Sequence, residues 1–432
     1  MTIKSFRQNG IIDSIYTIER GGAYFLFYDL AGMFFEVSQP TFAELKKRSS
    51  NNVAKILSSI QSYLTNKRTT LIDKNNRSIK AQKQRASLRI EVSNICNNKC
   101  AYCHVFKIGK YRSRKSVMPY KDARNVIADF LELASRYRLC ESYHINFYGG
   151  EPLITWNLIK TLISNFGLHH KRKRIVWSIN TNGRLLRQEM MPFLKKYDVE
   201  LHIGCDGMKD INDKLRRSSK NEGTFDEIQN AFNLANKYGV YKQINAVISN
   251  SNISKLRDIV DVAKENNVQV IYLDVLYMQN KLLNINRLAE AYKDVVKYSE
   301  QHQINLGGCC TNLVTRIKKK RMSVAMNKYD LLRSISISTD GGIYPTLFRS
   351  TPISKRSLST YFDEDNVAWQ ENFNDLFSDL STKCSRCFLH RYCNFAGILQ
   401  YRYHTKLEKG HNDSCAFLKE YVLAEMIDEI KR

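Results

Sequence analysis

Between residues 86 and 280, short apolar runs of strand length alternate with longer stretches in which apolar residues follow a helical period. Runs of the first kind predict strands, and stretches of the second kind predict helices. The predicted strands are Leu88–Ser93, Tyr143–Tyr148, Ile175–Asn180, Val199–Gly204, Tyr241–Ile248 and Gln269–Leu276. The predicted helices are Tyr120–Tyr137, Asn157–Phe166, Phe225–Tyr238 and Ser254–Asn266. Because each parallel crossover needs a helix, the alternation predicts an α/β fold, a partial (β/α)6 barrel over residues 86–280 with its chemistry at the carboxyl ends of the strands.

Two regions of different character flank this barrel. Residues 1–80 begin with three predicted strands and continue as a polar helical stretch, Phe42–Thr65, with Thr41 as its N-cap, so we expect a small winged-helix-like module. Its predicted strands are Ile12–Ile18, Ala23–Tyr28 and Met33–Val37. Residues 281–432 lack the alternation and carry six of the eleven cysteines before a last predicted helix, Ala416–Ile430. We therefore expect a cysteine-rich accessory domain at residues 281–432.

The composition narrows the class of protein. The chain is 43% hydrophobic, and it has neither an apolar run that spans a bilayer nor an apolar signal core, so we expect a cytoplasmic protein without a membrane partner. Thiols stay reduced in that compartment, which favours metal or cluster ligation over disulfides, with Cys140 expected as a free buried thiol. The net charge of +25 indicates either a solvated basic surface or an anionic partner. No base-reading motif is present, so nucleic acid is not the expected partner.

Two motifs carry the most chemical information. Cys96-Asn-Asn-Lys-Cys100-Ala-Tyr-Cys103 follows the first barrel strand. Three thiolates hold three irons of a four-iron cluster and leave the fourth iron open, and the alternative is a zinc site completed by His104. At the end of the second strand, Tyr148-Gly149-Gly150-Glu151-Pro152 combines glycines that admit a close ligand with a carboxylate that can bind an ammonium group.

Together these motifs resemble the signature of the radical S-adenosylmethionine (SAM) superfamily. The resemblance implies a [4Fe-4S] radical cluster, reductive cleavage of SAM, hydrogen abstraction from the substrate, and a reductant such as flavodoxin or ferredoxin. The implied cluster ligands are Cys96, Cys100 and Cys103. The implied SAM-binding residues are Tyr102, Gly149, Gly150, Glu151, Asn180, Asn182, Asp206 and Arg216.

A second group of cysteines resembles the SPASM domain, the auxiliary-cluster module of peptide-modifying radical SAM enzymes. The resemblance implies that an auxiliary [4Fe-4S] cluster is bound by Cys384, Cys387, Cys393 and Cys415. A zinc knuckle joined by His390 or His411 is the alternative. Thr346 and Gly397 stand where the family has two further cysteines, so the adjacent pair Cys309 and Cys310 is the remaining candidate for an inner cluster. We expect two four-iron clusters.

The SPASM resemblance also implies a peptide substrate, and residues 1–80 resemble the leader-binding element of ribosomal-peptide maturases. A precursor peptide with a leader is therefore the expected partner, and a side-chain cross-link of the cyclophane or darobactin type is the expected product. One alternative is an epimerase that uses Cys205 as hydrogen donor, although a thiol packed below SAM explains Cys205 as well. Formylglycine formation is disfavoured, because Leu347 stands where the family has a catalytic Asp. A basic metal protein that binds RNA without catalysis is the distant alternative.

Overall fold

The computed structural model describes most of the barrel and parts of both flanking regions. The described residues are 2–8, 11–20, 22–28, 33–47, 84–103, 116–136, 140–275, 284–308, 314, 315, 317, 335–344, 358, 389 and 408–430. Of the predicted site residues, Cys309, Cys310, Cys384, Cys387 and Cys393 lie outside this part of the chain.

The N-terminal region forms an antiparallel sheet followed by a helix, α1 (Gln39–Lys47). The sheet has the order β1-β2-β3-β4, with strands β1 (Thr2–Gln8), β2 (Ile11–Arg20), β3 (Ala23–Tyr28) and β4 (Met33–Val37). The three predicted strands are confirmed, and β1 is an additional one. The predicted N-cap is wrong: α1 begins before Thr41, and the Ser38 hydroxyl accepts a hydrogen bond from the Thr41 amide at 3.4 Å. The rest of the predicted helix, 48–65, lies outside the described residues.

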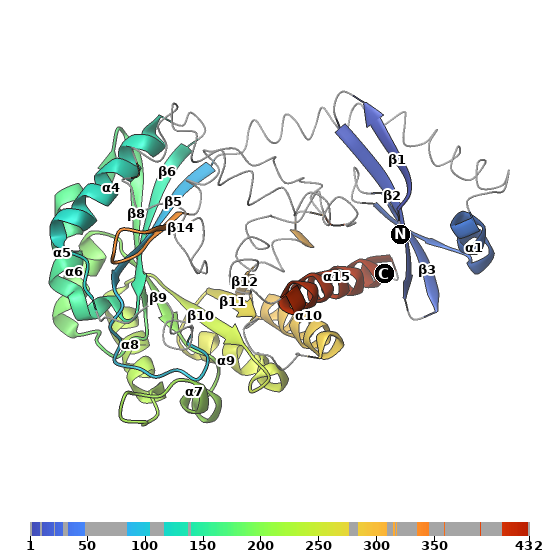
Figure 1. Ribbon diagram of the computed structural model, residues 1–432. Coiled ribbons are helices and arrows are strands. Elements are labelled where there is room, and N and C mark those ends of the chain that lie inside the picture. Colours follow the sequence, from blue (N-terminus) through green and yellow to red (C-terminus); the bar gives the residue numbers. More distant parts are fainter. Residues whose placement is uncertain are drawn as a thin grey trace.

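All six predicted barrel strands are present. They are β5 (Gln84–Ser93), β6 (Cys140–Gly149), β8 (Lys173–Thr181), β9 (Glu200–Gly204), β10 (Lys242–Ile248) and β11 (Val270–Val275). They lie side by side in chain order and pair in parallel throughout, while the two-residue strand β7 (His169–His170) pairs antiparallel with β8. The sheet curves, and Figure 1 shows helices along its convex side.

The helices connect successive strands. The four predicted ones are α4 (Tyr120–Ser135), α5 (Trp156–Phe166), α8 (Phe225–Tyr238) and α9 (Arg257–Glu265), and the sequence pattern did not reveal the shorter α6 (Met191–Lys196) and α7 (Lys209–Leu215). Single 3-10 turns occupy Pro152–Thr155, Gln188–Met190 and Ile253–Lys255. The inner stripe of α8, which includes Ile228 and Phe232, is fully buried against the sheet. An apolar core on the convex side therefore holds the strands in place.

The sheet extends beyond β11 and β5, which corrects the expectation that the alternation ends near residue 280. Helix α10 (Ile285–Gln301) leads to β12 (Asn305–Gly307), which pairs in parallel with β11. At the opposite edge, β13 (Ile335–Ile337) pairs in parallel with β5 and antiparallel with β14 (Ile343–Tyr344). The sequence pattern missed these strands because two or three residues carry no readable periodicity.

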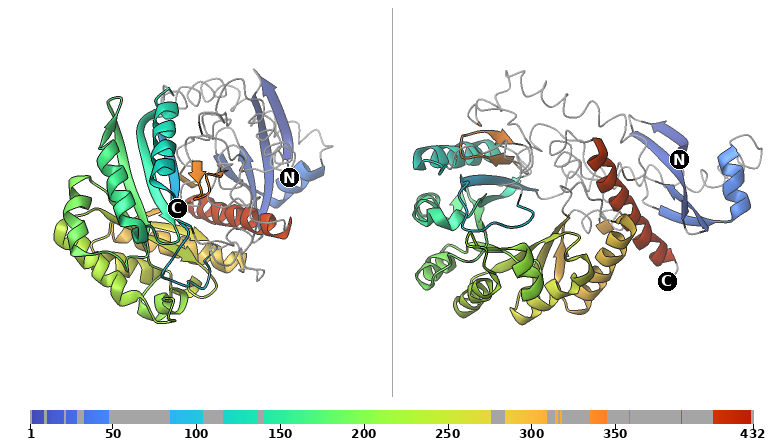
Figure 2. Two further views of the ribbon diagram at one scale, coloured as in Figure 1. Left: turned by 60° about the vertical axis from the view of Figure 1, so that its left-hand side comes forward. Right: turned by 60° about the horizontal axis from the view of Figure 1, so that its bottom comes forward.

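The last helix, α15 (Glu408–Ile430), packs along α10, as both views in Figure 2 show. Tyr421 and Phe417 of α15 meet the ring of Tyr292 on α10, with centroids 4.9 and 6.0 Å away. Cys415 lies in this helix, and its side chain is outside the described part. Among the described helices, none is long and apolar enough to cross a membrane.

Candidate functional site

The cysteine motif forms the loop directly after β5, at the carboxyl edge of the sheet. Cys96, Cys100 and Cys103 are each half-buried, and none of them forms a disulfide. Backbone hydrogen bonds tie the loop to the segment after α7: the Lys99 amide donates to the Arg217 carbonyl and the Ala101 amide to the Leu215 carbonyl, both at 2.7 Å. The loop therefore depends on a segment more than 100 residues away in the chain.

Gly149 and Gly150 bring the end of β6 against the same loop. A Cβ on Gly149 would lie 2.0 Å from the Ser93 carbonyl oxygen, and one on Gly150 would lie 2.2 Å from that of Ile95. The Gly150 amide donates to the Ser93 carbonyl at 2.7 Å, and the Glu151 amide donates to the Ile95 carbonyl at 2.8 Å. A side chain at either position would collide with this backbone, so glycine is required at both. In the described structure the space beside the two glycines is filled by the end of β5 and the cysteine loop.

Glu151 lies beneath the loop and is fully buried. Its carboxylate accepts three hydrogen bonds, from the amides of Leu153 (3.1 Å) and Asn182 (2.8 Å) and from the Thr181 hydroxyl (2.7 Å). Burial raises the pKa of Glu151 to about 7, and the three donors oppose that rise. Glu151 thus joins the ends of β6 and β8, and its predicted role as acceptor for the SAM ammonium group stays a prediction.

The fully buried Asp206 binds the half-buried Arg216 and Tyr102 beside Cys100. Two nitrogens of Arg216, Nε and Nη2, donate to the Asp206 carboxylate at 2.8 and 3.3 Å, and the Tyr102 hydroxyl donates to Oδ2 of the same group. The guanidinium carbon lies 5.5 Å from the centroid of the Tyr102 ring. In this geometry Arg216 is bonded to Asp206, and contacts of these three residues with SAM stay predictions.

Asn180, near the end of β8, and Asn182, just after that strand, lie at different distances from the cysteine loop. The Asn182 side chain donates to Asn97 Oδ1 at 2.7 Å and lies 3.8 Å from the Cys96 sulfur, so it borders the cysteine loop. Asn180 lies deeper in the barrel, where its Oδ1 accepts from Asn146 Nδ2 at 3.0 Å. Only Asn182 is therefore placed beside the candidate cluster site.

The thiol environment fits a metal cluster. Burial raises the pKa of Cys96 to about 12 and that of Cys100 to about 11, so free thiols there stay protonated at neutral pH. The Asn98 amide donates to the Cys96 sulfur at 3.4 Å, a contact that suits a thiolate. A bound cation offsets the burial cost and deprotonates such thiols. Three cysteines on one short loop are the donor set of a cluster with one open iron.

Cys205 and Cys140 are separate from this donor set. Cys205 has 0% exposure, and its thiol donates to the Gly207 carbonyl at 3.4 Å. Burial raises its pKa to about 12. These facts favour the interpretation of Cys205 as a packed thiol over that of a hydrogen donor. Cys140 is also buried in the core, as expected.

The sequence analysis missed the polar lining of the barrel's concave side. Polar side chains alternate with buried apolar ones along β5, β6, β8, β9 and β11, although strands buried on both faces are usually apolar throughout. This alternation of polar and apolar residues was the sequence signal that could have revealed the polar lining. The lining residues include Arg89, His144, Asn146, Ser178, Asn180, Glu200, His202, Tyr272 and Asp274.

Asp274 and Arg89 come from the two end strands of the six, β11 and β5. The Asp274 side chain is exposed to the lumen, but the barrel wall around it still desolvates the carboxyl and raises its pKa to about 6, while Arg89 opposes the rise. Arg89 Nη1 is buried and has no hydrogen-bond partner among the described residues. An unpaired buried guanidinium nitrogen is costly, so Arg89 is ready to bind an oxygen of a ligand.

Comparison with known proteins agrees with this geometry. Residues 90–263 match the Radical SAM superfamily, a range that contains the cysteine loop, the Gly-Gly-Glu segment and the Asp206–Arg216 pair. The radical SAM cyclopropyl synthase TigE of Paramaledivibacter caminithermalis is 27% identical over 241 residues. The alignment covers 53% of this chain, and the chain spans about half (50%) of the relative's length.

Solved structures share the fold over a longer range. The protein anSMEcpe, with bound AdoMet and a Kp18Cys peptide, aligns over 80% of this chain and 98% of its own, with a TM-score of 0.61 and 18% identity. Streptococcus suis SuiB, bound to its precursor peptide SuiA, aligns over 89% of this chain and 95% of its own, with a TM-score of 0.52 and 14% identity. At these identities the likeness establishes the fold of this chain.

Proposed function

Since residues 90–263 are a radical SAM domain, we propose that this chain is a maturase that acts on a ribosomally made precursor peptide and installs a cross-link between side chains. The carrying observation is the loop of three cysteines, held against the end of β6 and the end of α7 in a barrel with a polar concave side. We also propose an oxidative reaction class, because a cross-link removes two hydrogens from the peptide. One would leave as a hydrogen atom taken by the 5′-deoxyadenosyl group of SAM, and the other as a proton and an electron, with the auxiliary cluster as electron acceptor.

The cofactors are those of the superfamily, SAM and a [4Fe-4S] cluster. We propose that Cys96, Cys100 and Cys103 hold the cluster, which together with SAM supplies the radical that abstracts a hydrogen from an unactivated carbon. An auxiliary cluster on Cys384, Cys387, Cys393 and Cys415 remains part of the proposal.

The chain's own residues position these groups. Glu151 holds the ends of β6 and β8 together beneath the loop, while Asp206 fixes both Tyr102 and Arg216 beside Cys100. The Glu151 contacts are buried, and those of Asp206 with Tyr102 and Arg216 are partly buried. Asp274 faces the lumen with a pKa of about 6 and is our candidate to accept a substrate proton at neutral pH.

Three observations support a peptide substrate. The N-terminal sheet has two edge strands, β1 and β4, which can add an extended leader segment by backbone pairing. The net charge of +25 attracts an acidic leader over a long range. SuiB, which shares the fold, is bound to a precursor peptide in its structure. A cross-link is preferred to epimerisation because Cys205, the proposed far-face donor, is fully buried.

Co-expression of the enzyme with a short peptide encoded beside it, followed by intact mass measurement, tests the proposal. We expect the peptide to lose the mass of two hydrogens per cross-link, and the triple change of Cys96, Cys100 and Cys103 to Ala to abolish both this loss and SAM cleavage. An unchanged peptide mass with deuterium uptake at an α-carbon would establish epimerisation instead. Cleavage of SAM by the triple variant would refute the ligand assignment.

A further inference from the structure

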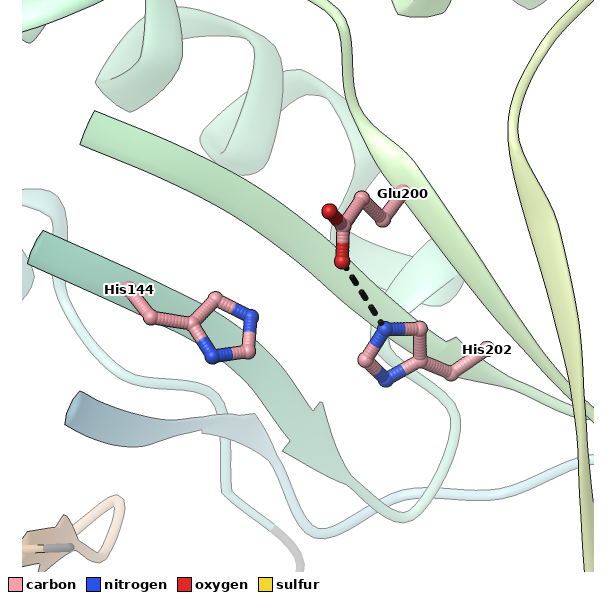
Figure 3. Close-up of side chains that lie close together, drawn as sticks. All are labelled: His144, Glu200 and His202. Carbon is pink, nitrogen blue, oxygen red and sulfur yellow. Dashed lines mark hydrogen bonds and ion pairs between the residues drawn. The ribbon is translucent and has the colours of Figure 1, made fainter. Parts of the chain in front are cut away.

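Two histidines and a glutamate converge inside the barrel, away from the cysteine loop. His144 lies on β6, and Glu200 and His202 lie on β9, with β8 between the two strands. Figure 3 shows the three side chains pointing toward one another. One ligand atom from each residue falls within 4.8 Å of the others. His144 precedes Gly149 by five residues, which places this group roughly 16 Å along the strand from the cysteine loop.

Both imidazoles are oriented by neighbours on β8. His202 Nδ1 lies 2.9 Å from Asn180 Oδ1, and that oxygen already accepts a hydrogen bond from Asn146. His144 Nε2 lies 2.8 Å from the Ser178 hydroxyl oxygen, which likewise accepts from Asn146. An amide oxygen can only accept, so His202 Nδ1 carries a proton, and Nε2 faces Glu200. Such outer hydrogen bonds are the usual way in which metal-binding histidines are held.

The distance between His202 and Glu200 is close to that between two ligands of one metal ion. His202 Nε2 and Glu200 Oε2 are 3.5 Å apart, which is long for a hydrogen bond. Two ligand atoms on one tetrahedral zinc ion, each about 2.05 Å from it, are separated by roughly 3.4 Å. Either a proton on Nε2 or a metal cation between the two atoms makes this approach favourable, and the separation matches that of two ligand atoms on one metal ion.

We propose that His144, Glu200 and His202 bind one divalent cation of the zinc class in the barrel lumen, independently of the iron–sulfur cluster. Two imidazoles and one carboxylate are the ligand set of open zinc sites, in which a fourth position takes water or a substrate oxygen. The side chains of His202 and Glu200 are 10% and 28% exposed, so a small ligand can reach that position. The cation would also join β6 to β9 across β8.

The test uses the full chain with its clusters reconstituted anaerobically, so that the cysteines carry iron. The protein is supplied with zinc, freed of excess by dialysis, and analysed by mass spectrometry of the metals and by zinc K-edge X-ray absorption. We expect about one zinc per chain with nitrogen and oxygen ligands only, and none in Glu200→Gln or His202→Ala. Ser178→Ala should weaken zinc affinity about 10- to 100-fold, because it removes the group that orients His144.

The matched control is His169→Ala, which removes an exposed histidine of β7 outside the lumen and should leave the zinc content unchanged. Glu200→Gln preserves side-chain size, so it decides the question even if His202→Ala fails to fold. Equal zinc content in wild type and Glu200→Gln, or sulfur among the zinc ligands, would overturn the proposal. The result does not depend on SAM or on a peptide, so it can fail while the proposed maturase function stands.

Discussion

Replacing Gly150 by alanine tests whether the Gly-Gly-Glu segment supports the cysteine loop. The added methyl group would lie 2.2 Å from the Ile95 carbonyl oxygen and 2.5 Å from its carbon, whereas ordinary contacts begin at 3.4 Å. Backbone atoms cannot swing aside as a flexible side chain can, so the end of β6 and the loop must separate by about 1 Å.

The expected cost follows from the contacts that this separation breaks. The Gly150–Ser93 and Glu151–Ile95 hydrogen bonds, now 2.7 and 2.8 Å long, stretch out of range. Each is worth about 0.5–1.5 kcal/mol, and the residual overpacking adds about 1–3 kcal/mol. The free energy of unfolding should therefore fall by about 2–6 kcal/mol, a large part of the roughly 5–15 kcal/mol of a typical domain. A 1 Å displacement at a reactive site can also cost about 100-fold in rate.

Urea unfolding of the apo chain measures the stability, and 5′-deoxyadenosine release by the reconstituted enzyme measures SAM cleavage. Gly167→Ala is the matched control. Gly167 has φ of +64° and ψ of −149°, but no heavy atom lies within 4 Å of an added Cβ, so only the backbone strain of about 1–3 kcal/mol applies. If Gly150→Ala is as stable as Gly167→Ala and cleaves SAM at the wild-type rate, the support attributed to this contact is refuted.

Three further changes probe the buried groups. Asp206→Asn leaves the Arg216 guanidinium, only 11% exposed, without its counter-ion, and should lower the free energy of unfolding by about 3–5 kcal/mol. A second change, Arg216→Gln, should restore part of this loss in urea titrations. A loss below about 1 kcal/mol for Asp206→Asn would contradict the pairing. Cys205→Ala should cost about 1 kcal/mol and keep the peptide cross-linking activity, whereas loss of activity in a folded variant would revive the hydrogen-donor role. The pKa of Asp274 is raised from 3.8 to about 6, so the folded chain binds this proton more tightly than the unfolded chain does. The contribution of Asp274 to the free energy of unfolding is therefore fully present below pH 3.8 and is lost as the pH rises through about 6. If Asp274 accepts a substrate proton, kcat/KM should rise over the same range, and Asp274→Asn should abolish both dependences; a rise that persists in the variant assigns it to another group.

Much of the barrel could be predicted because its signals are local. Each strand is a short apolar run and each long helix has an apolar stripe, so elements such as β6 and α8 are marked by residues adjacent in the chain. The Cys96–Cys103 motif is local in the same sense, since eight consecutive residues contain all three thiols. Only three of the four strands of the N-terminal sheet were predicted, because β1 carries charges that disguise an edge strand.

What the sequence by itself determined is therefore the order of strands and helices and the cysteine loop that follows the first barrel strand. Tertiary structure alone decided the contacts of individual side chains around that loop. Tyr102 and Asp206 lie 104 positions apart, and Gly150 meets Ile95 only because β5 and β6 pair in parallel. His144 and His202 lie close together because only β8 stands between β6 and β9 and the sheet is curved. Contacts of this kind depend on register and curvature, which arise from the packing of the whole barrel and leave no periodic pattern in the chain.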